Sequence, residues 1–274
     1  MTSTTISILG CGYVGHPLAK LLVNQGWRVR GATTQKQKLS TLLADGIEPY
    51  LLKLTPSLIG HGKRDFFDSD VMVINFPPGR KRPNVIEFLG DAMDSLLGYL
   101  SQGDVKKVIF ISSTSVYASG HVQESDAGNQ IPGSASGVAL LKAENTLLEA
   151  SAFETTILRF AGLYGYERSP GKFWSGRVLC DPHNAVNMLH RDDAVGVVLE
   201  IIYQNYFEEV FNVCAEQHPS RAEFYLKAAL NQGIPPPLIQ ESEPKNKNKI
   251  VLTDKLRTLV GYRFKYPDPL SNAP

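Results

Sequence analysis

Apolar residues along the chain follow two alternating patterns. Short runs rich in β-branched residues occupy 5–9, 27–32, 70–76, 106–112 and 155–160, where the first run reads TISIL and the fourth KKVIFIS. Apolar residues recur at helical spacing over 14–25, 35–44, 84–101, 137–150, 192–205 and 220–232, and Asp192 is the expected N-cap of the fifth of these helices. This alternation of strands and helices predicts an α/β fold with a parallel sheet that is covered on both faces.

The composition favours a small-molecule partner. The 274 residues are 43% apolar, which is enough for a full core, and 28 basic against 27 acidic side chains leave a formal charge of +1. Such a balance argues against nucleic acid or an anionic membrane as the main partner. The charged stretch EPKNKNK, at 243–249, is expected to be a solvated loop rather than a binding patch.

The cysteines and the hydropathy suggest a cytoplasmic protein. Cys11, Cys180 and Cys214 are odd in number, far apart and without CxxC spacing, so neither a disulfide framework nor a metal site is expected. The sequence starts without a basic leader, and no apolar run reaches the roughly 20 residues that span a bilayer. A reducing, cytoplasmic location is therefore the expectation.

A glycine-rich loop follows the first predicted strand. In TISILGCGYVGHPLAKLL, Gly10, Gly12 and Gly15 lie between a strand and a helix, which is the context of the dinucleotide-binding fingerprint. There the first glycine allows a tight turn, the second lets the backbone approach a pyrophosphate, and the third lets helix and strand pack closely. The alternative is a merely flexible turn. The residues expected to bind the cofactor here are Gly10, Cys11, Gly12, Tyr13, Val14 and Gly15.

The second predicted strand favours NADP over NAD. An NAD site usually carries an acidic residue about 20 residues after the glycines, but no Asp or Glu lies between His16 and Ala44. The strand end, RVRGATTQKQK, instead offers hydroxyl and cationic groups suited to a 2′-phosphate. The expected partners are Arg30, Thr33, Thr34 and Lys36, although such side chains are often simply exposed.

Four further segments, in order, resemble the extended short-chain dehydrogenase/reductase family, which includes nucleotide-sugar epimerases, dehydratases and atypical relatives. They are VIFISSTSVYASG (108–120), ILRFAGLYG (157–165), NAVNMLHRDDAVGVV (184–198) and EVFNVCAEQHPSR (209–221). With the glycine loop, the resemblance runs from residue 6 to about 266. It implies a doubly wound Rossmann fold in one domain, 1–274. The sheet core would cover about 5–160 plus 186–214, and a small substrate-side part about 161–185 and 215–274.

The resemblance also implies site residues. Further cofactor contacts are expected from the ends of later strands, at Asn75, Phe76, Pro77, Ser112, Phe160, Ala161 and Gly162. Ser113 falls on the family's catalytic Ser/Thr and ends a central strand beside the ligand crevice. A serine at a strand end also commonly bonds its own backbone.

The family's catalytic Tyr-x-x-x-Lys pair is absent. Within GSASGVALLKAENTLLEA (133–150), Ser136 occupies the tyrosine position and Leu140 the lysine position, and Lys142 points to a different helix face. A serine hydroxyl cannot simply replace the phenol as a general acid or base. The resemblance suggests Tyr164 and His190 as replacements, with Tyr117 as a further candidate. The alternative for His190 is that it holds its segment to the core.

Two functions fit these observations. The first is an NADP-binding oxidoreductase or epimerase/dehydratase-like enzyme with a non-standard site, acting on a small polar substrate such as a sugar or nucleotide sugar. Phe173 and Trp174, in KFWSGR, would then lie against the substrate or simply pack in the interior. The alternative is a non-catalytic NAD(P)-binding regulatory or sensor protein. Loss of the Tyr/Lys pair favours the second function, whereas Ser113 and the His190 segment favour the first.

Overall fold

The computed structural model describes residues 4–77, 79, 82–118, 122–123, 130, 132–241 and 248–271. Its main sheet has eight strands in the order β12-β8-β6-β5-β1-β2-β3-β4, all neighbours being parallel except β3 and β4. The strands are β1 (Thr5–Leu9), β2 (Arg28–Thr33), β3 (Glu48–Leu54), β4 (Leu58–Gly60), β5 (Val71–Ile74), β6 (Lys107–Ser113), β8 (Glu154–Phe160) and β12 (Val210–Val213). The predicted α/β fold with a parallel sheet is confirmed.

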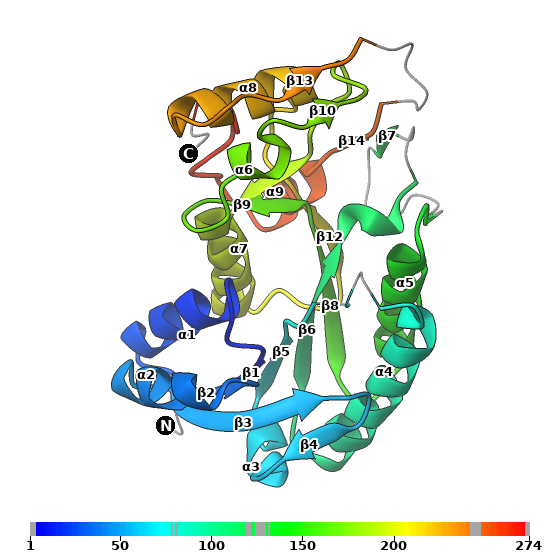
Figure 1. Ribbon diagram of the computed structural model, residues 1–274. Helices are drawn as coiled ribbons and strands as arrows, with labels where there is room; N and C mark the ends of the chain where they lie inside the picture. The colour runs from blue at the N-terminus through cyan, green and yellow to red at the C-terminus, as the bar shows by residue number, and fades with distance from the viewer. Residues whose placement is uncertain are drawn as a thin grey trace.

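Helices cover both faces of this sheet (Figure 1). On one side lie α1 (Gly15–Asn24), α2 (Leu39–Ala44), which follows a 3-10 turn at Lys36–Lys38, and α7 (Arg191–Gln204); on the other lie α3 (Lys63–Phe67), α4 (Val85–Gln102) and α5 (Ala135–Leu148). Central strands such as β5 are buried on both faces, which explains their unbroken apolar runs. Within the described residues, no helix is long and apolar enough to cross a membrane.

The later part of the chain forms a second layer beyond the carboxyl edge of the sheet (Figure 1). It contains β9 (Gly162–Tyr164), α6 (Gly171–Trp174), β10 (Val178–Leu179), β11 (Met188–His190), α8 (Arg221–Asn231), β13 (Leu238–Ile239), β14 (Ile250–Val251) and α9 (Asp254–Leu259). Three parallel strand pairs, β9–β11, β10–β13 and β14 with β7 (Val122–Gln123), connect its segments. A small apolar cluster of its own includes Tyr164, Met188 and Phe224.

Candidate functional site

A cavity of about 980 Å³ opens at the carboxyl ends of β1, β2, β5, β6 and β8. It lies where β1 sits between β2 and β5, so that successive crossovers leave the sheet in opposite directions. Open α/β sheets bind ligands at such a switch point. The sequence-predicted cofactor residues that line it are Gly10, Cys11, Gly12, Tyr13, Val14, Thr33, Thr34, Asn75, Phe76, Pro77, Ser112, Phe160, Ala161 and Gly162.

The glycine loop leaves room beside the cavity. Gly10 has φ of 114° and a Cβ on it would lie 1.9 Å from the Asn75 carbonyl oxygen, while a Cβ on Gly15 would lie 2.2 Å from the Gly10 carbonyl oxygen. A Cβ on Gly12 would meet no atom within 4 Å, so it would project into open space. The first and third glycines therefore serve packing, and the second keeps the backbone accessible. This arrangement fits a pyrophosphate.

Helix α1 begins at the cavity without a capping side chain. Its N-cap is Val14, which provides no side-chain hydrogen bond, and its first turn contains no acidic residue. The N–H groups at a helix N-terminus favour an anion when no side chain accepts from them. Cys11 beside this turn has its pKa raised to about 12 by burial, so the thiol stays neutral there.

The end of β2 differs from the sequence expectation at two positions. Thr33 and Thr34 line the cavity together with Gln35 and Lys38, which sequence reasoning had not selected. Arg30 does not: it is 5% exposed, and its guanidinium donates to the Asp65 and Asp68 carbonyls. This corrects the role expected for Arg30, because side chains alternate across a strand and its guanidinium is held elsewhere.

Lys36 is also absent from the described lining. It is exposed in the turn at Lys36–Lys38, whereas Lys38, two residues later, is partly buried and lines the cavity. In such a tight helix, residues two apart point in different directions. The basic side chain that lines the cavity at the end of β2 is therefore Lys38 rather than Lys36.

Ser113 lies in the cavity wall at the end of β6. Its Oγ accepts a hydrogen bond from the Ser115 N–H at 3.2 Å, as the N-cap of a 3-10 turn at Thr114–Val116. Ser113 therefore bonds its local backbone and also faces the cavity. A hydroxyl fixed in this way can still donate its proton to a ligand.

The position of the family's lysine also faces the cavity, but with an aliphatic side chain. Leu140 lines the wall, whereas Ser136 is not among the described lining residues and its Oγ lies 3.2 Å from that of Ser134. Ser134 caps α5 by accepting from the Gly137 N–H at 3.2 Å. The start of α5 therefore contributes apolar surface where the family has an ammonium group.

Tyr164 and Tyr117 belong to the interior. Tyr164 is fully buried, its ring packs edge-on against Phe224, and it is not among the described lining residues. Burial also raises the pKa of its phenol. Tyr117 is 2% exposed and donates to Asn212 Oδ1 at 2.8 Å. Tyr164 is therefore not placed as a proton donor to the cavity, because its ring is packed in the apolar cluster with Phe224 and Met188.

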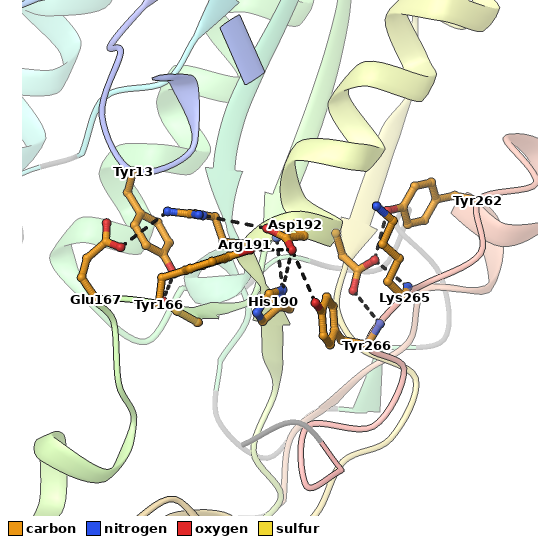
Figure 2. Close-up of polar contacts among 11 residues, drawn as sticks. Tyr13, Tyr166, Glu167, His190, Arg191, Asp192, Tyr262, Lys265 and Tyr266 are labelled. Carbon is orange, nitrogen blue, oxygen red and sulfur yellow. Dashed lines mark hydrogen bonds and ion pairs between the residues drawn. The ribbon is translucent and has the colours of Figure 1, made fainter. Parts of the chain in front are cut away.

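His190 holds α7 in place. Its Nδ1 accepts from the Asp192 N–H at 3.2 Å, so the N-cap of α7 is His190 rather than the expected Asp192. The imidazole stacks 3.7 Å from the Tyr266 ring, centroid to centroid, and burial lowers its pKa (Figure 2). His190 is 7% exposed and is not among the described lining residues, so its position fits the alternative in which it holds its segment to the core rather than a role in proton transfer.

The residues after His190 tie two distant segments to α7 (Figure 2). The Asp193 carboxylate accepts from the backbone N–H of Lys265 at 2.7 Å and of Tyr266 at 3.0 Å. The Arg191 guanidinium lies 3.6 Å from the centre of the Tyr166 ring and within 4.0 Å of Asp192. Helix α7 is therefore present as expected, with its N-cap two residues earlier than predicted.

Tyr13 links the glycine loop to the segment after β9. Its hydroxyl donates to the Gly165 carbonyl at 2.6 Å, and the Arg168 guanidinium lies 4.1 Å from the centre of its ring. Arg168 lines the cavity. Because cations stack favourably on tyrosine faces, this contact keeps a guanidinium beside the glycine loop.

The cavity has a one-sided charge. Of the described residues that line it, three are basic, namely Lys38, Arg168 and Lys249, and none is acidic. Lys38 follows β2, Arg168 lies over the glycine loop, and Lys249 reaches the cavity from the segment before β14. Such a lining attracts an anionic ligand and repels a cationic one.

Lys249 is a residue that sequence reasoning missed. It lies in the stretch 243–249, which was expected to be a solvated loop. Residues 243–247 of that stretch are outside the described part, but Lys249 is partly buried. Neither periodicity nor motif distinguishes this lysine from its neighbours. Tyr225 and Phe173 line the same side of the cavity, and Trp174 packs near Tyr225, 6.0 Å between ring centres.

A buried polar network supports the floor of the site. Glu144 on α5 is fully buried and pairs with Arg159 on β8 at 2.6 Å, while the Ser112 hydroxyl donates to the same carboxylate. Arg159 also donates to the Tyr117 hydroxyl at 2.8 Å. Because a buried charge is tolerated only when it is paired and hydrogen-bonded, this network fixes α5 against β6 and β8.

Comparison with known proteins identifies the family of the chain. No family model matches the chain. The chain is 34% identical over 269 residues to protein YeeZ of Escherichia coli strain K12, covering 97% of each protein. It belongs to the YeeZ family.

Solved structures share the fold of this YeeZ-family chain. UDP-glucuronic acid 4-epimerase from Bacillus cereus, in a variant bound to UDP-4-deoxy-4-fluoro-glucuronic acid and NAD, matches with a TM-score of 0.80 and 17% identity over 98% of each chain. A putative NAD-dependent epimerase/dehydratase from Methylobacillus flagellatus matches with a TM-score of 0.72 and 24% identity, covering 99% of this chain and 96% of that one. The chain therefore has the fold of the extended short-chain dehydrogenase/reductase superfamily, as its motifs indicated.

Proposed function

We propose that this protein binds NADP and is an oxidoreductase or epimerase/dehydratase-like enzyme with a non-standard active site. The observation that carries the proposal is the cavity itself. In it, the glycine loop and an uncapped helix start meet at the switch point of the sheet, and the described lining residues include basic but no acidic side chains. The group supplied by the cofactor would be a nicotinamide ring that exchanges hydride. The chain would supply the pyrophosphate cradle, the phosphate-binding cation and Ser113.

The preference for NADP rests on the end of β2. Thr33, Thr34 and Lys38 line the cavity there, and Gln35 lies between them. No carboxylate lies among the described lining residues to accept from a ribose 2′-hydroxyl. An ammonium group beside two hydroxyls suits a 2′-phosphate.

The lining of the cavity and the proteins that share this fold support a proposal for the substrate class. The Bacillus cereus epimerase is described with a UDP-sugar and NAD together. The present cavity extends to Phe173, Tyr225 and Lys249, which come from the later part of the chain. These observations support a small polar substrate such as a sugar or nucleotide sugar.

A non-catalytic NADP-binding role is the second candidate, and one observation favours it. Leu140 lines the cavity at the position where the family has lysine, so the usual proton-transfer pair has no counterpart on α5. Turnover would distinguish the two roles. A panel of nucleotide sugars incubated with the NADP-loaded protein should give an epimerised, dehydrated or oxidised product if the first role holds, and none if the second does.

The cofactor preference has a direct test. We expect calorimetric titration to show tighter binding of NADP than of NAD. Lys38→Met should weaken the affinity for NADP by about tenfold while changing the affinity for NAD by less than about twofold. Lys36→Met is the matched control, because Lys36 is exposed and lies outside the described lining. Equal or tighter binding of NAD by the unmodified protein contradicts the preference.

A further inference from the structure

Lys249 enters the cavity from a segment that no motif marks. Its Nζ donates to the Thr114 carbonyl at 3.3 Å and to the Tyr117 carbonyl at 3.4 Å. Thr114 directly follows Ser113, so the ammonium group lies next to the end of β6. The side chain therefore brings a positive charge to the substrate end of the cavity.

The backbone around Lys249 is held in place. The Asn187 side chain donates from Nδ2 to the Lys249 carbonyl at 2.9 Å and accepts from the Val251 N–H at 2.9 Å. Asn187 precedes Met188, which lines the cavity and begins β11. Two bonds from one amide therefore fix the register of this segment against the cavity wall.

The start of α5 meets the same turn. A Cβ on Gly137 would lie 2.3 Å from the Ser115 carbonyl oxygen, so this glycine lets α5 pack directly on the turn that Lys249 contacts. Leu140, one helical turn further, lines the cavity. Lys249, Ser113 and the lysine position of α5 are thus brought together around Thr114–Val116 by tertiary structure alone.

The charge of Lys249 has carbonyl partners but no carboxylate partner among the described residues. An ammonium group has three N–H bonds, and the Thr114 and Tyr117 carbonyls accept two. Burial lowers the pKa of Lys249, and the titratable group that acts on it is the Cys214 thiol, whose own pKa is raised to about 12 by burial. A half-buried cation of this kind is stabilised by an anionic oxygen that enters the cavity.

We propose that Lys249 is the substrate-binding cation of this protein, which holds an anionic or partly negative substrate oxygen beside Ser113 and replaces in space the ammonium group that α5 lacks at Leu140. The inference rests on the proposed function, because it requires a dinucleotide in the glycine-loop end of the cavity. It adds the class of group recognised at the other end, an oxygen that carries negative charge.

Sulfite and cyanide addition to bound NADP tests this charge without turnover. The sulfur lone pair of sulfite forms a bond to C4 of the oxidised nicotinamide, the ring loses its positive charge, and the new substituent keeps a negative charge; nothing leaves. Cyanide forms a carbon–carbon bond to the same atom and leaves a neutral substituent. Both adducts are measured by near-ultraviolet absorbance.

We expect the sulfite adduct of protein-bound NADP to be more stable than the sulfite adduct of NADP free in buffer. Lys249→Met should weaken the sulfite adduct by about tenfold to a hundredfold, the range for a lost hydrogen bond to a charged group, while changing the cyanide adduct by less than about twofold. Lys249→Arg should retain most of the effect. Lys142→Met is the control, because Lys142 is exposed on α5.

Three results overturn the inference: no stabilisation of the sulfite adduct by the unmodified protein, an unchanged sulfite adduct in Lys249→Met, or equal losses for both adducts, which would indicate a misplaced cofactor. If Lys249→Met does not fold, Lys249→Gln is titrated in its place, because its neutral side-chain amide can still donate to the Thr114 carbonyl. Calorimetry with NADP precedes each titration. Failure of NADP to bind refutes the proposed function and this inference with it, whereas binding without a charge effect refutes the inference alone.

Discussion

At the nucleotide end of the cavity, Gly10, Gly12 and Gly15 remain in the spacing typical of the family, and the sequence motif and the folded loop agree. At the proposed substrate end, Leu140 lines the cavity at the position where the short-chain dehydrogenase/reductase family has lysine, and Ser136, at the tyrosine position, is not among the described lining residues. The lysine that lines the cavity there is Lys249. A backbone cradle needs glycines at fixed positions in one loop, whereas a charge can reach a cavity from any segment that lines it. The first kind of site is therefore visible in the sequence and the second is not.

The largest expected effect is at the nucleotide end. Gly12→Val should abolish the thermal stabilisation that NADP gives. The added side chain would project into the space beside the loop, through which the pyrophosphate must approach the backbone. The ligand-free protein should keep its melting temperature, since a Cβ there meets no atom within 4 Å. Differential scanning fluorimetry with and without NADP measures both. An unchanged NADP-dependent shift would refute the assignment.

The substrate end gives a contrast between two serines. If the protein turns over, Ser113→Ala should reduce the rate because Ser113 faces the cavity beside Lys249, by on the order of 10²-fold to 10⁴-fold if its hydroxyl shares in proton transfer. Ser136→Ala should be nearly silent, since Ser136 is not among the described lining residues. The measurement is the rate of product formation at saturating NADP. A large loss in Ser136→Ala, with folding and cofactor affinity intact, would show that this serine performs the tyrosine's role.

The smallest effect concerns two histidines, the buried His190 and the partly buried His218. Burial lowers the pKa of His190 and of His218 below the usual value of about 6.5. The unfolded chain then binds protons that the folded protein does not, so the free energy of unfolding should rise with pH up to about 6.5 and fall on acidification below it. His190→Asn, which can still cap α7, should reduce this slope.

Urea unfolding between pH 5 and 8 measures the slope, with the change for one histidine at most about 1.4 kcal/mol per pH unit. His183→Asn is the control, because His183 is exposed with its ring 3.0 Å from Glu241. If His190→Asn left the slope unchanged, the buried imidazole would not be neutral in the folded protein, and a role for it in proton transfer would be open again.

The sequence by itself determined the α/β fold, most of its central elements and the nucleotide end of the cavity. The strand 5–9 coincides with β1, because a short run rich in β-branched and apolar residues suits a strand buried on both faces. The glycine loop could also be predicted, since its three glycines follow a strand in the spacing of the dinucleotide-binding fingerprint. Arg30 was misplaced because sequence shows that a cation is near a strand end, but not which face of the sheet its side chain takes.

Only the tertiary structure decided the substrate end. Tyr164 and His190 were selected by their segments, yet β9 and the start of α7 turn these rings towards the interior, against Phe224 and Tyr266. Lys249 became a cavity residue because Asn187 holds the segment before β14 against the turn after β6. Such placements depend on contacts between residues more than 60 positions apart, and no local pattern of polar and apolar residues encodes them.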